Sequence, residues 1–170
     1  MQLNQQTDFA FRLLMYLADQ ATRNATTKAA TERTTDEATA TTALPKIREI
    51  ADYFDISYNH LMKVANTLAA RGYVKARRGK GGGLALARPE SCISLGAVAR
   101  DMEGHWELVE CFGTTGDCRI TSSCRLAPIL GEALEAFWAV LDHYTLADIA
   151  HLPPGETPLT FHRHPPQHTQ

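Results

Sequence analysis

Two short helical patterns, separated by a very tight turn, constrain the fold of this chain most strongly. Apolar residues at i, i+3, i+4 and i+7 spacing predict a helix that begins after Pro45 and ends near Asp55. A second helix is expected to begin at Ser57, a residue type that caps helix N-termini, and to end near Gly72, where a left-handed cap is usual. The residues expected to be buried are Ile47, Ile50, Ala51, Phe54, Leu61, Val64, Ala65 and Leu68. Two helices joined this closely have the layout of a helix-turn-helix.

A basic, glycine-rich segment follows and favours a winged helix over an ordinary helical hairpin. Residues 73–76 and 84–87 are short strand candidates, and the glycines between them permit a tight hairpin tip. Residues 71–88 hold six basic side chains and no acidic one, although the whole chain has a net charge of −2. The fold class we expect is mainly α with a small β-hairpin wing, forming a winged helix-turn-helix DNA-binding domain.

Three further segments complete the expected organisation. An apolar helical stripe predicts a first helix from Gln5 to about Asp19, followed by a flexible insertion at residues 21–43 with seven Ala and nine Thr. A second apolar stripe begins at Leu126 and continues for about five turns on one long helix, more than a small winged helix needs, so we expect part of it to dimerise the chain. The expected divisions are residues 1–90, the winged helix-turn-helix domain; 91–125, a short helix and a cysteine loop; 126–150, the dimerisation helix; and 151–170, a disordered tail.

The candidate DNA contacts follow from this layout. A helix-turn-helix inserts the N-terminal part of its second helix into the major groove, and a basic wing neutralises phosphates or enters the minor groove. When the basic wing is considered by itself, the alternative interpretation is a solvent-exposed hairpin that binds no partner. The expected recognition residues are Ser57, Tyr58, Asn59, His60 and Lys63, and the expected backbone or wing contacts are Arg71, Lys75, Arg77, Arg78 and Lys80. A dimer would present both sets to an inverted repeat in double-stranded DNA.

Three of the four cysteines lie close together, in the stretch ECFGTTGDCRITSSCRL. Cys111, Cys118 and Cys124 are separated by six and five residues, whereas structural zinc sites pair cysteines two to four residues apart. Longer loops suit an iron-sulfur cluster, in which each thiolate holds a different corner. Zinc, a redox-active thiol set and a 2Fe-2S cluster stay open on spacing alone. Cys92 lies apart from them, beside a helix cap, and we expect it to be a small buried apolar residue.

Six short motifs stand out beside the three clustered cysteines, at residues 7–12, 56–61, 78–84, 109–112, 124–126 and 144–148. Together they resemble the iron-sulfur winged-helix repressors, a family with NsrR-type nitric-oxide sensors and IscR-type regulators. The NsrR-type branch is the closer match, because IscR-type members have a histidine three residues after the last cysteine, where this chain has Ala127. This sequence departs from the family in a longer first cysteine gap and in the Ala/Thr-rich insertion.

The resemblance implies a specific site and signal. Its ligands would be Cys111, Cys118, Cys124 and Asp8, the aspartate contributed by the other subunit, on a cluster that is 4Fe-4S or, as the second candidate, 2Fe-2S. A carboxylate is a harder and more replaceable iron ligand than a thiolate, so nitric oxide is expected to displace Asp8 first. Arg12, one helical turn on, is expected to pair with Asp8 and to carry the change toward the DNA face. Loss of the cluster would then release the repressor from its operator.

Other function classes have less support. No nucleophile with a nearby base, phosphate loop or carboxylate pair indicates an enzyme, and an electron carrier has no use for a basic wing. A winged-helix regulator that responds to zinc, to 2Fe-2S redox state or to thiol oxidation is the main alternative. The sequence has no apolar run of membrane-spanning length and no secretion signal at its start, so we expect a cytoplasmic protein.

Overall fold

The computed structural model describes most of the chain between Leu3 and Ala150. The described residues are 3–31, 43–79, 81–104, 108–109, 112, 118–120 and 123–150, with the backbone alone for 26–31. The elements are α1 (Gln5–Thr31), α2 (Ile47–Phe54), α3 (Tyr58–Ala70), β1 (Val74–Arg77), β2 (Gly83–Leu86), the 3-10 turn η1 (Glu90–Cys92), α4 (Leu95–Glu103), α5 (Leu126–His143) and α6 (Leu146–Ala150). This confirms the expected fold class, a mainly helical chain with one β-hairpin. In the described part, no helix is both long and apolar enough to cross a membrane.

The turn between α2 and α3 has the tight geometry of a helix-turn-helix. Asp55 ends α2 in the left-handed region, with φ of 55°, which aspartate tolerates better than most residues. Ser57 occupies the expected N-cap position of α3, but its side chain makes no capping hydrogen bond. Gly72, with φ of 73°, follows α3 as the expected left-handed cap. The turn therefore depends on backbone conformation more than on side-chain capping.

The wing is an antiparallel hairpin held against the segment that precedes α2. β1 and β2 pair with Val74 opposite Leu86, so each strand is shifted by one residue from its expected position. A Cβ atom on Gly83 would lie 2.5 Å from the carbonyl oxygen of Leu44. The glycines of the wing therefore permit a close backbone approach as well as the hairpin tip.

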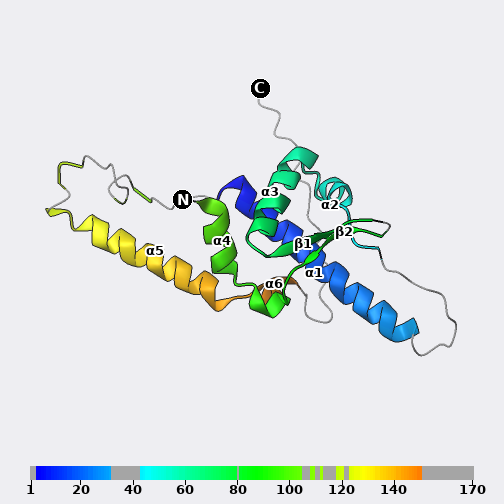
Figure 1. The fold of residues 1–170 in the computed structure, drawn as a ribbon. Helices are drawn as coiled ribbons and strands as arrows, with labels where there is room; N and C mark the ends of the chain where they lie inside the picture. Colours follow the sequence, from blue (N-terminus) through cyan, green and yellow to red (C-terminus); the bar gives the residue numbers. More distant parts are fainter. Residues whose placement is uncertain are drawn as a thin grey trace, which may run out of the picture.

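The core is built around α1, which contacts α3, α4, α6 and β2 (Figure 1). Fully buried side chains come from helices α1, α2, α3, α4 and α6 and from Ile93, and burying each one contributes about 1.5–3 kcal/mol. The largest of them are Leu13, Leu14, Ile50, Leu61, Leu68, Ile93 and Leu146. This packing fixes α3 by one face and leaves its other face to solvent.

α1 is longer than the sequence led us to expect, because it continues past Asp19 to Thr31. The expected flexible insertion is thus helical in its first part, and residues 32–42 lie outside the described residues. Alanine has the highest helix propensity, and threonine costs at most about 0.7 kcal/mol per residue. An ion pair at i, i+4 spacing between Asp19 and Arg23, at 2.8 Å, supports the extension.

The expected single helix at 126–150 is two helices, because α5 ends at His143 and α6 starts at Leu146. Thr145 caps α6: its N–H and its hydroxyl both donate to the Asp148 carboxylate at 2.7 Å. That network lowers the pKa of Asp148. Thr145 also pairs with Ser94, so the chain turns back and buries Leu146 in the core.

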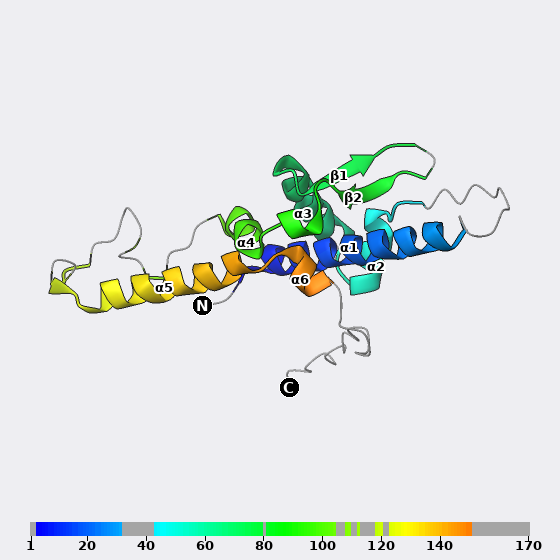
Figure 2. The ribbon, with the colours of Figure 1, turned by 90° about the horizontal axis from the view of Figure 1, so that it is seen from below.

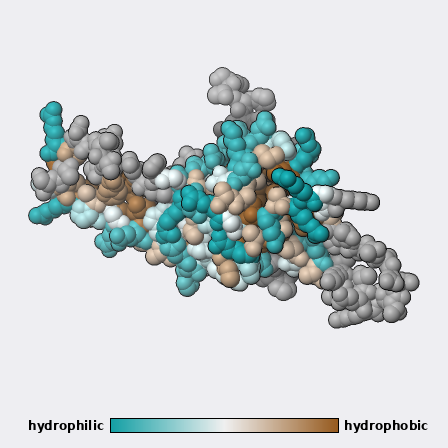
Figure 3. All heavy atoms as spheres, in the orientation of Figure 1, coloured by the Kyte–Doolittle hydropathy of each residue, from teal (hydrophilic) through white to brown (hydrophobic). Residues whose placement is uncertain are grey.

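α5 projects from the body as an arm (Figure 2). Apolar side chains lie on its surface, and Figure 3 shows brown patches along it. Leu126, Ile129 and Val140 are 58%, 61% and 58% exposed. The described residues of this chain therefore leave these apolar side chains of α5 uncovered.

Candidate metal centre and nucleic-acid interface

The expected recognition residues share the exposed side of α3. Ser57, Tyr58, Asn59, His60 and Lys63 are all exposed, whereas the opposite face of the helix is buried in the core. These side chains can therefore reach base edges without disturbing the fold. Their contact with DNA stays a prediction.

One arginine beside the recognition helix was not anticipated. Arg48, on α2, lies over the ring of Tyr58 with its guanidinium carbon 4.9 Å from the ring centroid. Such a cation–π contact contributes about 0.5–1 kcal/mol at an exposed site and holds both side chains in place. No sequence periodicity links these two residues, because the contact depends on how α2 crosses α3.

The expected wing residues divide into two groups. Lys75, Arg77 and Arg78 are exposed on the hairpin, as a phosphate contact requires, and Lys80 lies outside the described residues. Arg71 instead lies at the base of the wing, where it pairs with Asp101 of α4 at 3.4 Å. Its positive charge is therefore partly neutralised by Asp101 and is less available to a phosphate.

The base of the wing is tied to α4 through Tyr73. The buried Tyr73 donates its hydroxyl hydrogen to Asp101 at 2.7 Å. Burial, followed by this hydrogen bond, raises the pKa of Tyr73 to about 12, so the phenol stays protonated as a donor. Arg88 packs over the Tyr73 ring at 4.5 Å and donates to the carbonyl oxygens of Gly72 and Arg71. The angle between wing and α4 thus depends on a small hydrogen-bonded cluster.

The cysteines are only partly described. Cys118 is exposed, and Cys124 is partly exposed just before α5, while Cys111 lies outside the described residues. Within the described ranges no three His, Cys, Asp or Glu side chains lie together. Cys92, expected to be buried, is exposed in η1, because the short 3-10 turn carries it along the surface while the neighbouring Ile93 enters the core.

Asp8 lies in the first turn of α1 and pairs with Arg12 as expected. The Arg12 Nη2 atom is 2.7 Å from Asp8 Oδ2, and the two side chains are 32% and 48% exposed. Ion pairs this exposed contribute at most about 1 kcal/mol. The carboxylate can therefore exchange Arg12 for another partner at small cost.

A polar clamp fixes the start of α1 to the end of α4. Asn4 caps α1 by accepting from the Thr7 N–H at 2.8 Å. The Glu103 carboxylate accepts from the Asn4 N–H at 2.8 Å and from the fully buried Thr7 hydroxyl at 2.6 Å. An asparagine just before a helix is a recognisable cap signal, but a partner 96 residues away is not readable from the sequence. This clamp positions the turn that carries Asp8.

The last turn of α4 therefore contacts three parts of the molecule. Arg100 pairs with Asp142 of α5, with Nη1 to Oδ1 at 2.7 Å, and lies 4.6 Å above the Trp138 ring centroid. The same pairing raises the pKa of Arg100 and lowers that of Asp142. Asp101 contacts the wing and Glu103 contacts α1, and the cysteine loop begins just after this turn.

Comparison with known proteins assigns the chain to a family. Residues 30–152 match Rrf2, described as an iron-dependent transcriptional regulator. The chain belongs to the Rrf2 family. Two relatives are HTH-type transcriptional regulators named NsrR, from Geobacillus kaustophilus and Bacillus licheniformis, at 41% and 39% identity over 150 residues. The matches cover 88% of this chain and 89% and 92% of the relatives.

Solved structures of Rrf2-like fold agree with the architecture. An oxidized form of Staphylococcus aureus CymR has a TM-score of 0.62 at 20% identity, covering 90% of this chain and 98% of that one. T. potens IscR has a TM-score of 0.60 at 21% identity, with 88% and 85% covered. These likenesses support the winged-helix fold of this Rrf2-family chain. Its named relatives are regulators rather than enzymes or electron carriers.

Proposed function

We propose that this Rrf2-family chain is a homodimeric transcriptional repressor that senses nitric oxide through an iron-sulfur cluster. The proposal is carried by its 37–41% identity, across 88% of its length, to regulators named NsrR. In the cytoplasm, where its operator DNA would lie, the cluster-bound form binds an inverted repeat. Reaction with nitric oxide releases it.

The donor set fits an iron-sulfur cluster. The proposed ligands are Cys111, Cys118 and Cys124 of one subunit and Asp8 of the partner subunit, with 4Fe-4S preferred over 2Fe-2S. Thiolates are the usual ligands of such clusters, and the exposure of Cys118 and Cys124 leaves both thiols accessible. When bound, the cluster supplies iron to which nitric oxide can bind.

Asp8 is the proposed replaceable ligand. A carboxylate oxygen binds iron less firmly than a thiolate, and its pair with Arg12 offers an alternative partner close by. We propose that Asp8 returns to Arg12 when nitric oxide reacts with the site. Because Asp8 would come from the other subunit, this exchange removes a tie between the two chains.

The last turn of α4 is the proposed route to the DNA-binding surface. It leads directly into the cysteine loop, while Asp101 holds the base of the wing and Glu103 holds the first turn of α1. A movement of the cysteine loop would thus act on the wing and on the first turn of α1 through the hydrogen bonds of Asp101 and Glu103. Coupling between the cysteine loop and the DNA-binding surface would require the last turn of α4 to adopt two arrangements.

An anaerobic preparation tests the function. The chain supplied with iron and sulfide is expected to be brown and to bind an operator selected from random duplexes. Nitric oxide should bleach it and weaken operator binding roughly 5- to 150-fold, the usual range of coupling between sites. A colourless protein with one zinc per chain that binds the same operator would contradict the proposal.

Asp8→Ala is expected to leave a cluster that assembles but is lost faster, because one iron loses its protein ligand. The lifetime of the visible absorption under a chelator measures this. Asp19→Ala is a matched control, since it breaks a similar exposed pair with Arg23 on the same helix and should leave the lifetime unchanged. Equal lifetimes in the two variants would show that Asp8 is not a ligand.

A further inference from the structure

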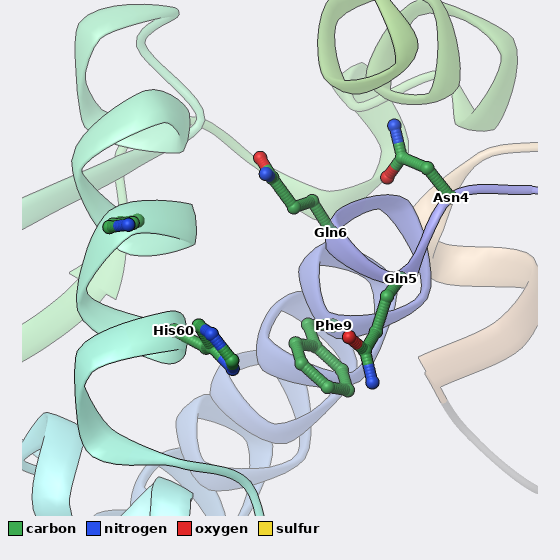
Figure 4. A pocket seen from close by; sticks show the side chains of 6 residues that line it. Asn4, Gln5, Gln6, Phe9 and His60 are labelled. Atoms are coloured by element: carbon green, nitrogen blue, oxygen red, sulfur yellow. The ribbon is translucent and has the colours of Figure 1, made fainter.

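A cleft of about 300 Å³ lies between the first turn of α1 and the recognition helix α3. In Figure 4, His60 extends from α3 toward Phe9, and Gln6 leaves α1 on the side of α3. Lys63 supplies a positive charge, and no carboxylate is among the lining residues. The residues that line the cleft are Asn4, Gln5, Gln6, Phe9, His60 and Lys63.

The position of the cleft follows from the geometry of α3. Residues of an α-helix are about 100° apart around its axis, so Asn59 lies opposite the buried face of α3, and Lys63 lies between Asn59 and His60 around that axis. His60 lies nearer the edge that faces α1. On the other edge, Tyr58 is covered by Arg48 of α2. The recognition helix thus has polar groups from a neighbouring helix on each side.

This arrangement corresponds to the shape of a DNA groove. The major groove is about 12 Å wide, and the phosphates of the two strands form its walls. A helix inserted into the groove has one row of phosphates on each side. The cleft would face one of these rows, and the Arg48 side the other.

We propose that the cleft binds one phosphodiester group of the DNA backbone. Lys63 neutralises its charge, and the side-chain amides of Gln5 and Gln6 donate hydrogen bonds to its oxygens. The inference rests on the proposed DNA-binding function and adds the start of α1 to the surface that contacts DNA. Backbone contacts of this kind fix the orientation of a protein on the duplex.

The side chains of the cleft have the donors this role needs. Among the described residues, Gln5, Gln6 and Lys63 make no side-chain hydrogen bond or ion pair with the rest of the protein. Asn4 is different, because its side chain accepts from Thr7 and donates to the carbonyl oxygen of Met102. Asn4 therefore supports the cleft, and the two glutamines are the donors available to a ligand.

Binding to non-specific duplex and to a selected operator, over a range of salt concentrations, tests the proposal on the full-length protein. Lys63→Met should weaken both complexes and reduce the slope of log K against log salt by about 0.9, the value for one phosphate. Gln5→Ala and Gln6→Ala should each weaken both complexes roughly 3- to 10-fold. Gln20→Ala, the same change farther along α1, should alter neither complex.

A neutral methylphosphonate at successive operator positions identifies the phosphate. At one position in each half-site, the replacement should weaken binding by the wild-type chain but not by Lys63→Met. Unchanged affinities and slopes in the cleft variants would overturn the proposal. A loss confined to the operator would also overturn it, because Lys63 would then read a base.

These outcomes separate the cleft from the sensing function. If the wild-type chain binds duplex DNA without any response to nitric oxide, the sensor proposal fails, and the non-specific duplex still tests the cleft. If the operator is bound and released by nitric oxide but the cleft variants match the wild type, only the cleft proposal fails. A wild-type chain that binds no duplex contradicts both.

Discussion

Cys124→Ser is expected to abolish cluster binding and, with it, every response to nitric oxide. A serine hydroxyl stays protonated near neutral pH and is a much harder ligand than a thiolate, so one of three strong iron ligands is lost. Anaerobic reconstitution should give a colourless chain with iron and sulfide contents near zero. Operator affinity should then be the same with and without nitric oxide.

Cys92→Ser provides the matched control for this change. Cys92 is exposed in η1, outside the cysteine loop, so its replacement should leave the brown colour, the iron content and the nitric-oxide response intact. Cys118→Ser should behave like Cys124→Ser. A Cys124→Ser chain that holds as much iron as the wild type would remove Cys124 from the ligand set and with it the proposed site.

The winged helix and α4 were predictable because their signals are local. Gly72 takes the left-handed conformation that its place after α3 predicts. Ser94 caps α4 through its side chain, which accepts from the N–H of Ala97, and Gly104 ends that helix. Each of these residues acts within one helical turn, so the short stretch of sequence around it contains the whole cause.

The elements that differ from expectation depend on long-range contacts or on small energy differences. The break between α5 and α6 has one local signal, the capping pair Thr145 and Asp148, which we did not use. Its other causes are long-range: Thr145 pairs with Ser94, and Leu146 enters the core. The extension of α1 depends on alanines outweighing threonines by tenths of a kcal/mol per residue. Cys92 is exposed because it lies at the end of a short 3-10 turn on the surface, whereas the next residue, Ile93, enters the core.

The candidate site also combines features that follow from local sequence with features that depend on long-range contacts. The exposed residues of α3 and the Asp8–Arg12 pair follow from helical spacing, and both are present in the structure. The ties of α4 to the wing and to α1 join residues 28 and 96 positions apart. Such contacts come from packing, so the proposed route from the cysteine loop to the wing needed the structure.

Placing a charge on the exposed apolar stripe of α5 should convert the protein to monomers. Ile129 and Val140 are three turns apart, and both are exposed. Trp138 and Asp142, which contact Arg100 of α4, lie on the opposite side of the helix. The stripe is therefore free to pack against the same stripe of a second chain, as a two-fold symmetric dimer requires.

The expected size of this effect follows from the number of apolar side chains that the dimer interface would lose. Ile129→Glu with Val140→Glu removes four buried side chains from a symmetric dimer, on the order of 6 kcal/mol or more, which raises the dissociation constant at least about 10⁴-fold. Analytical ultracentrifugation should show half the wild-type mass, and operator affinity should fall to that of a single half-site because avidity is lost. Ala139→Glu places the same charge about 100° away from Val140 and should leave the dimer intact. A dimeric double variant would mean that another surface joins the two chains, and Asp8 would then need a different route to the cysteines of its partner.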